Sequence, residues 1–332
     1  MNKGRTLFCG MMLVVVLFLC GCMNQEESAE KEGIPAPEEE IIENPCPACG
    51  AALQEEMPLG KDESGYHYAQ KCTSCSYEKR WQYDALLTFV DDDGKMQAML
   101  HWERIIDATG IEMTAALIPE KIGEMTDYDK WWSYAGWDLL DRMGQKGMDF
   151  VHHTYSHKNL TKLSETEIRE DLKKSQDALK RRGIDSRILV CPNNASNDTV
   201  RAAARDYFDV AVICGNQINV ESFHRNYGLH RMNSNDAERM KTIRFDAERI
   251  VECQTIKSEE KLEQELTMAI DSRGWLIYMT HAYDSPAGAF YFDEEAEETL
   301  IHFCQYAMSG GNVRIVSLTE GVAASAPLVD AN

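Results

Sequence analysis

The chain has 332 residues, too many for one small domain, and the composition of a soluble globular protein. It carries 34 basic and 55 acidic side chains, a formal net charge of −21. This charge argues against nucleic acid as a partner, because binding to nucleic acid depends on Lys and Arg contacts to phosphate. A neutral or cationic partner fits it better, although an acidic composition commonly serves solubility alone.

Residues 1–21 have the pattern of a signal peptide. A short basic start precedes an apolar run from Leu7 to Gly21, which at fifteen residues is shorter than the ~20 needed to cross a bilayer as a helix. The run ends in Leu-Cys-Gly-Cys at 19–22, which resembles the lipobox of bacterial lipoproteins. The resemblance implies lipidation of Cys22 and an extracytoplasmic protein anchored to the cell membrane. An ordinary cleaved signal with an incidental cysteine is the alternative.

Residues 22–44 are predicted to be a flexible acidic tether. The stretch 25–44 holds eight glutamates and one lysine, and it contains Pro35 and Pro37. It shows no apolar periodicity, so it cannot bury enough surface to fold.

Two pairs of cysteines follow, Cys46 and Cys49 in CPACG and Cys72 and Cys75 in CTSC, with a spacer of 22 residues between the pairs. Two C-x2-C knuckles can place four thiolates at the corners of a tetrahedron, which suits Zn(II). Residues 45–82 therefore predict a zinc-ribbon-like module, with a turn at Gly50 and a strand in GYHYAQ. Its zinc would be structural, because four protein ligands leave no open position. A pair of disulfides, common in exported proteins, is the rival reading.

From about residue 85 onward, strand-like apolar runs alternate with helical patterns. The expected strands are 86–90, 112–118, 148–152, 186–192, 209–214, 275–281 and 312–318. The expected helices are 95–108, 131–147, 164–183, 199–207 and 294–308, the third with a capping box, Ser164 followed by Glu167. This alternation predicts right-handed crossovers and a parallel sheet or barrel, an α/β fold with its site at the C-terminal strand ends.

Four polar motifs lie at such strand ends: the aspartates 91–93, HHTYSH, CPNN and THAYD. In HTYSH, His153 and His157 are four residues apart, and on a helical turn they would share one face as two imidazole ligands for one divalent metal. Two histidines and one carboxylate leave positions open for water and substrate, which is the pattern of a hydrolytic metal site. Thr154 could orient this segment through its hydroxyl, and His152 is expected to be supporting or structural.

These motifs resemble those of the NodB-homology polysaccharide deacetylases, carbohydrate esterase family four. TFVDDDG and HTYSH carry the specific part of the resemblance, while CPNN and MTHAYD match more loosely. The resemblance covers most of residues 84–326 and implies a distorted (β/α) barrel that removes N- or O-acetyl groups from glycans with a divalent metal, Zn(II) being the first candidate.

When the roles of the family's motif residues are transferred to the matching positions, the resemblance implies that Asp93, His153 and His157 bind the metal. Asp92 would be the general base and His281, after the late strand, the general acid.

The sequence departs from the family pattern in two places. Val90 and Asp91 stand between Phe89 and the aspartate pair, so either Asp92 and Asp93 keep the roles above or the register slides to Asp91 and Asp92. Gly94 as an anchor favours the first reading. The arginine that commonly pairs with the base in this family is also absent beside Pro192, and Arg231 could substitute for it from another loop.

The sequence thus predicts a metal-dependent hydrolase acting on an acetylated glycan, with N-acetyl groups first. The alternative is a catalytically weak or inactive deacetylase fold that binds surface glycan, which the missing arginine motivates.

Overall fold

The computed structural model describes residues 44–125, 133–214, 241–242, 260–280 and 294–328, all of which belong to one unit of the chain, Glu43–Asn332. The predicted signal peptide, Cys22, Arg231 and His281 lie outside the described residues, as does the tether except for Asn44. None of the helices within these ranges is long and apolar enough to cross a membrane.

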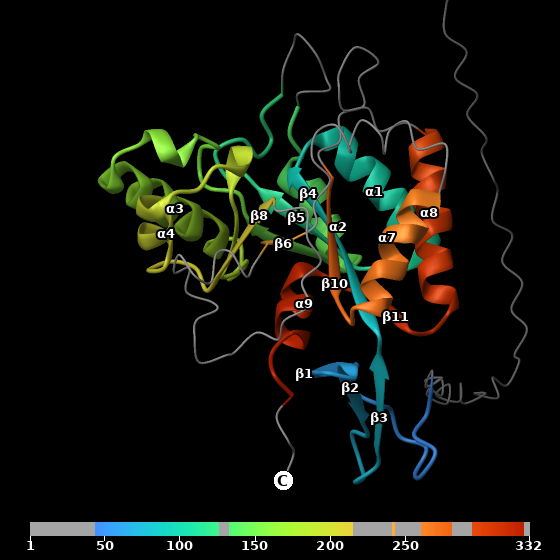
Figure 1. Ribbon diagram of the computed structural model, residues 1–332. Coiled ribbons are helices and arrows are strands. Elements are labelled where there is room, and N and C mark those ends of the chain that lie inside the picture. The colour runs from blue at the N-terminus through green and yellow to red at the C-terminus, as the bar shows by residue number, and fades with distance from the viewer. Residues whose placement is uncertain (1–43, 126–132, 215–240, 243–259, 281–293, 329–332) are drawn as a thin grey trace, which may run out of the picture. The chain divides into compact units, whose positions relative to one another are not determined.

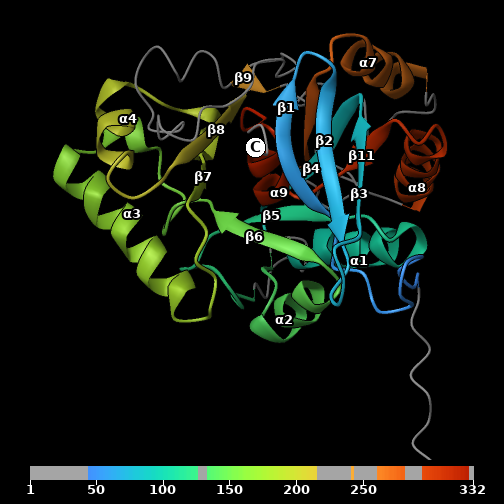
Figure 2. The same cartoon turned by 90° about the horizontal axis from the view of Figure 1, so that it is seen from below.

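Parallel strands form the centre of the fold. Within the described residues one sheet has eight strands, in the order β10-β4-β5-β6-β7-β8-β9, and β11 pairs with the start of β4. Every pairing in it is parallel. The strands are β4 (Ala85–Asp93), β5 (Met113–Leu117), β6 (Met148–His152), β7 (Ile188–Val190), β8 (Val210–Cys214), β9 (Lys241–Thr242), β10 (Trp275–Thr280) and β11 (Val313–Ile315). The curled sheet with its helices confirms the predicted α/β fold, a distorted (β/α) barrel (Figures 1 and 2).

Helices connect these strands and cover the sheet. They are α1 (Met96–Thr109), α2 (Trp137–Gln145), α3 (Glu165–Lys180), α4 (Asp198–Ala204), α7 (Glu260–Asp271), α8 (Glu294–Ser309) and α9 (Leu318–Ala324), with the 3-10 turns η2 (Leu160–Lys162) and η3 (Pro192–Asn194). Helices α1, α7 and α8 lie together on one side, and α3 packs on α4 on the other (Figure 1).

Strand β4 is buried along its whole length, as expected for a central strand with both faces covered. Leu87 and Phe89 belong to the core formed with α1, α7 and α8. Leu86 and Val90 belong to a second core, inside the curled sheet. The strand therefore has a helix-facing side and an inner side, which alternate by residue.

One predicted helix starts later than expected. The pattern from Trp131 to Gly147 predicted a single helix, but α2 begins at Trp137, after Gly136 in an extended conformation. Ahead of it, Tyr134 N–H donates to the carbonyl of Glu124 and Ala135 N–H to that of Gly94. These main-chain bonds hold the segment against the end of β4, so its backbone is not free for helical bonding. By contrast, α3 begins with the predicted capping box.

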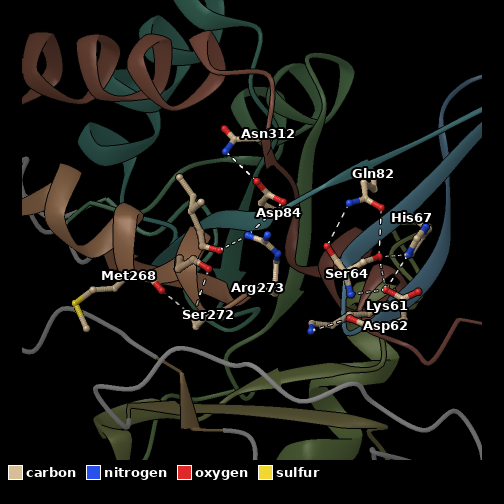
Figure 3. A network of polar contacts seen from close by, with 12 residues as sticks. Lys61, Asp62, Ser64, His67, Gln82, Asp84, Met268, Ser272, Arg273 and Asn312 are labelled. Atoms are coloured by element: carbon tan, nitrogen blue, oxygen red, sulfur yellow. Dashed lines mark hydrogen bonds and ion pairs between the residues drawn. The ribbon is translucent and has the colours of Figure 1, made fainter.

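The cysteine-bearing segment forms a separate antiparallel sheet, β1 (Met57–Asp62), β2 (Gly65–Lys71) and β3 (Glu78–Tyr83), in that order. Only Asp84 separates β3 from β4. Its carboxylate lies 3.3 Å from Arg273 Nη1 and accepts a hydrogen bond of 3.1 Å from Asn312 Nδ2, as Figure 3 shows. The junction between the two sheets is thus a short, fixed link.

This small sheet shares the core of the barrel. Tyr66 and Tyr68 of β2 are buried in the same apolar cluster as Leu86 and Trp275, at the end of the barrel where β4 begins. Both views place β1–β3 at that end (Figures 1 and 2). Asp93, at the far end of β4, is about 26 Å away at ~3.3 Å per residue. The cysteine module therefore closes the end of the barrel opposite the aspartates.

Candidate functional site

Three predicted ligands meet at the C-terminal end of the sheet. Asp93, His153 and His157 each offer one ligand atom, and these atoms all lie within 4.8 Å of one another. Asp93 Oδ1 is 3.5 Å from His153 Nε2 and 3.3 Å from His157 Nε2. The carboxylate comes from the end of β4 and the two imidazoles from the segment after β6, so the parallel sheet brings together residues some sixty positions apart.

The backbone turns sharply where β4 ends. Asp93 has φ 81° and Gly94 φ 68°, both in the left-handed region. Asp tolerates this region better than most residues, and Gly occupies it freely. A Cβ at Gly94 would also lie 2.8 Å from Leu117 Cδ2. The turn ends the regular alternation at Asp93, so that two consecutive carboxylates, those of Asp92 and Asp93, both approach His153.

His153 is held in the tautomer that a metal ligand needs. Its Nδ1 lies 2.8 Å from the carbonyl oxygen of Val190, at the end of β7. A carbonyl only accepts, so Nδ1 carries the proton and the lone pair of Nε2 faces Asp93. The backbone N–H of His153 donates to the carbonyl of Leu117, at the end of β5. Two neighbouring strand ends thus fix this ring, whose side chain is 2% exposed.

His157 reaches the site from an irregular loop. The prediction that HTYSH forms a helical turn is wrong, because residues 153–159 have no regular structure and Thr154 (φ 65°) and His157 (φ 58°) are left-handed. The two imidazoles nevertheless lie with ring centroids 4.9 Å apart. Thr154 Oγ1 accepts a hydrogen bond of 3.0 Å from His157 N–H, the orienting contact expected of its hydroxyl.

The other two aspartates, Asp91 and Asp92, have different surroundings. Asp92 Oδ2 is 4.0 Å from His153 Nε2, so this buried carboxylate borders the three-residue cluster. Asp91 instead accepts hydrogen bonds from Trp102 Nε1 of α1 and from Thr280 Oγ1 of β10. Its carboxylate is therefore engaged on the helix-facing side of β4.

The donor set fits a divalent metal. Ligands about 2.1 Å from a tetrahedral zinc lie about 3.4 Å from one another, close to the 3.3 and 3.5 Å found between the carboxylate and the imidazoles. One carboxylate and two neutral imidazoles are ligands that Zn(II) accepts, and three protein ligands leave a position for water or substrate.

A buried lysine stands next to the ligand Asp93. Lys95 Nζ lies 3.5 Å from the ring centroid of Tyr134, in the segment that runs alongside the end of β4. Burial lowers the pKa of Lys95 to about 8, against the opposing effect of Asp93. Burial and the charge of Asp93 raise the pKa of the Tyr134 hydroxyl. The sequence had not singled out this pair.

Two further predicted motifs, CPNN and THAYD, follow strands that end at the same edge of the sheet, but only Thr280 of THAYD is among the described residues. In CPNN, Cys191 is extended after the end of β7 and Pro192–Asn194 form η3, in which Asn193 has a left-handed φ of 56°. Strand β10 ends at Thr280, paired in register with Asp91, and the predicted general acid His281 is the next residue, outside the described part of the chain.

The four cysteines of the module form a second cluster, with their Sγ atoms within 4.8 Å of one another. Cys46 and Cys75 Sγ are 3.7 Å apart and Cys49 and Cys72 Sγ 3.5 Å apart. A disulfide needs about 2.05 Å. Four sulfurs about 2.3 Å from a tetrahedral zinc lie about 3.8 Å from one another. The spacing therefore suits the expected structural zinc.

Backbone amides support this cluster. Ala48 N–H donates to Cys46 Sγ and Ser74 N–H to Cys72 Sγ. Such donors stabilise thiolates, and the Ser74 amide is the main reason why the pKa of Cys72 is lowered to about 6. The predicted turn at Gly50 is present, with φ 77°.

Residues 82–208 match the family model for polysaccharide deacetylase. The matched part includes all three aspartates and the two predicted histidine ligands. No curated protein matches the chain.

The chain is also similar to solved structures, three of which have the following identity, coverage and TM-score. The family 4 carbohydrate esterase from Streptomyces lividans is 16% identical, over 73% of this chain and 97% of that one, with a TM-score of 0.44. The peptidoglycan deacetylase PdaC from Bacillus subtilis is 14% identical, over 72% and 89%, with a TM-score of 0.40. The Xyl-CE4 domain of a xylanase from the hindgut metagenome of Trinervitermes trinervoides is 14% identical, over 71% and 88%, with a TM-score of 0.41.

The sequence reading missed one residue that contacts the histidine loop. Asp171 of α3 accepts hydrogen bonds from Tyr155 N–H and Ser156 Oγ. A signal was present, since Asp171 occupies the apolar face of the helix pattern together with Ile168 and Leu172. A carboxylate at such a position needs a buried partner.

Proposed function

We propose that this chain is a metal-dependent deacetylase of an acetylated polysaccharide, acting on N-acetyl groups first. The observation that carries the proposal is the cluster of Asp93, His153 and His157 beside Asp92, at the C-terminal strand ends in the part of the chain that matches the polysaccharide deacetylase model. A hydrolytic metal site requires this combination of few protein ligands and an adjacent base.

Asp93 Oδ1 and the Nε2 atoms of His153 and His157 would hold the divalent metal, with Zn(II) as first candidate. When bound, it would polarise the acetyl carbonyl and acidify the attacking water. Asp92 would take the proton of that water as general base, and His281 would return a proton to the leaving amine or alcohol as general acid. Val190 keeps the Nδ1 proton of His153 in place, so that the Nε2 lone pair stays available.

The test is acetate release from N-acetylglucosamine oligomers and from O-acetylated xylan, with and without chelator. Release that stops on chelation, returns with metal and is lost in a folded His153→Ala variant supports the proposal. Undiminished release by that variant contradicts it.

A second candidate function is glycan binding without catalysis. Its motivation is the segment after β7, Cys191–Pro192–Asn193–Asn194, which has no arginine to pair with the base. Retention on an N-acetylglucosamine polymer by protein that holds metal but releases no acetate would favour this candidate.

The proposal includes the cellular setting and the cysteine module. Cys22 would carry a lipid that anchors the protein to the outer side of the cell membrane, and loss of fatty-acid labelling in Cys22→Ala would support this. Cys46, Cys49, Cys72 and Cys75 would hold a structural Zn(II) far from the reaction, as their closed four-thiolate arrangement favours.

A further inference from the structure

Helix α3 carries a carboxylate on the face that packs against the rest of the domain. Asp171 is 7% exposed and shares this face with the buried Ile168, Leu172 and Ser175. Burying a carboxylate is costly unless hydrogen bonds compensate. The partners of Asp171 therefore indicate what the position is for.

Both partners belong to the loop between the two predicted histidine ligands. Tyr155 N–H donates to Asp171 Oδ1 over 2.7 Å, and Ser156 Oγ donates to Asp171 Oδ2. One side chain thus holds two consecutive loop residues, one of them through its main chain. Hydrogen bonds to a charged acceptor stabilise a structure more than hydrogen bonds between neutral groups.

The loop needs such support because its backbone is strained. Thr154 and His157 both have a left-handed backbone conformation that is unfavourable for residues other than glycine. Packing also constrains the two histidines unequally, since the His157 side chain is 31% exposed and that of His153 2%. The position of His157 therefore depends more on the path of the loop than the position of His153 does.

We propose that Asp171 is a positioning residue of the metal site, which holds the loop 153–159 so that His157 Nε2 faces Asp93 before metal binds. The inference rests on the metal site in the proposed function but not on the reaction or its substrate. One turn further along α3, Ser175 Oγ lies 2.8 Å from His152 Nδ1, so the same helix face also supports the strand end next to His153.

The test compares Asp171→Ala and Asp171→Asn with the matched control Asp177→Ala. Asp177 lies on the exposed side of the same helix, where it pairs with Lys173. Two readouts are independent of activity: hydrogen exchange of residues 153–159 in the chelator-treated full chain, and cobalt affinity. The near-ultraviolet thiolate bands report the cysteine site, and the d–d intensity that remains after subtracting the spectrum of the cysteine-bound cobalt reports the Asp–His site in the same sample.

We expect Asp171→Ala to accelerate exchange in the loop and to weaken cobalt binding at the Asp–His site at least tenfold, with the thiolate bands unchanged. Asp171→Asn keeps an acceptor for Tyr155 N–H, so its loop exchange and cobalt affinity should change less than those of Asp171→Ala. Asp177→Ala should match the wild type. If Asp171→Ala does not fold, Ser156→Ala, which removes only the hydroxyl donor, decides with the same readouts.

Unchanged loop exchange and cobalt affinity in a folded Asp171 variant overturn the inference, even if the variant melts earlier, because Asp171 would then be a packing residue only. Wild-type protein that binds cobalt but releases no acetate would count against the proposed reaction and leave this comparison intact.

Discussion

The indole Nε1 of Trp102 donates a hydrogen bond of 3.2 Å to Asp91 Oδ2, inside the core between β4 and α1. Thr280 Oγ1 donates to the same oxygen over 2.9 Å. The neighbouring carboxylate of Asp92 lies instead 4.0 Å from His153 Nε2. The three consecutive aspartates are therefore divided between the core on one side of β4 and the candidate site on the other.

This division predicts three different outcomes for the same substitution. Asp91→Asn should keep metal and most of the activity, because its side chain faces Trp102. Asp92→Asn should keep metal but lose activity by 10²-fold or more, the usual contribution of a general base. Asp93→Asn should lose metal. Metal content and acetate release, measured on the three purified variants, check the prediction. Inactive Asp91→Asn together with metal-bound Asp93→Asn would instead support the register that places the pair at Asp91 and Asp92.

The choice between the two registers shows where sequence reasoning stops. The continuous apolar run predicts a buried strand at Leu86 to Val90, and side chains alternate between the two faces of any strand. The left-handed turn at Asp93 and Gly94 interrupts that alternation, and no local pattern specifies whether a turn begins one residue earlier or later. The position of each carboxylate depends on tertiary contacts, such as the bond from Trp102.

The same limit applies elsewhere in the chain. Local signals correctly predicted the parallel strands and the capping box of α3, and the four cysteines expected to act together lie close to one another. They failed for the HTYSH loop, because the expected helical turn is overridden by bonds to Leu117, Asp171 and Val190 from distant elements. They also gave no sign that Tyr66 and Tyr68 would enter the barrel core.

Metal content should separate the two clusters. Wild-type chain is expected to bind about two zinc ions, and His157→Ala and Cys49→Ser about one each. Of these two variants, only His157→Ala should lose acetate release, because activity depends on the metal at the Asp–His site. Elemental analysis with acetate release on the same samples checks this. Two ions retained in Cys49→Ser would contradict the four-thiolate assignment, and one ion in the wild type would mean that one of the clusters is empty.

Arg314 should be important for stability, because it joins the cysteine module to the barrel. Its guanidinium pairs with Glu56, ahead of β1, and with Glu320 of α9 at 2.8 Å, and it lies 4.9 Å from the ring centroid of Tyr68. Arg314→Ala is expected to lower the free energy of unfolding by about 2–4 kcal/mol, since it leaves partly buried carboxylates without their partner. Arg314→Lys should recover only part of this, because an ammonium lacks the planar fork.

Urea unfolding, followed by far-ultraviolet circular dichroism, measures the effect. The control is Arg187→Ala, whose pair with Asp209 is exposed on both sides and should contribute less than about 1 kcal/mol. The module and the barrel share a core, so one transition is expected for both. Separate transitions, with Arg314→Ala shifting only one, would show that the cysteine module unfolds by itself.

His152 should make the fold sensitive to mild acid. Desolvation lowers its pKa to about 4. Its Nε2 lies 3.1 Å from the carbonyl oxygen of Ser186, and only neutral Nδ1 can accept from Ser175 Oγ at 2.8 Å. Between the ordinary pKa of about 6.5 and about 4, the unfolded chain binds a proton that the folded chain does not. Stability is therefore complete above this window and falls as the pH decreases through it.

The loss attributable to His152 should reach at most about 3 kcal/mol at the acid end of the window. Urea unfolding of metal-free protein at pH 7.5 and pH 5 measures it, and chelator removes the contribution of metal bound to His153 and His157. His152→Gln should lower stability at pH 7.5 but lose less than the wild type on going to pH 5. His302→Gln, at an exposed position of α8, controls for the chemical change itself. An equal loss between the two pH values in wild type and His152→Gln would show that His152 is protonated in the folded chain as readily as in the unfolded one.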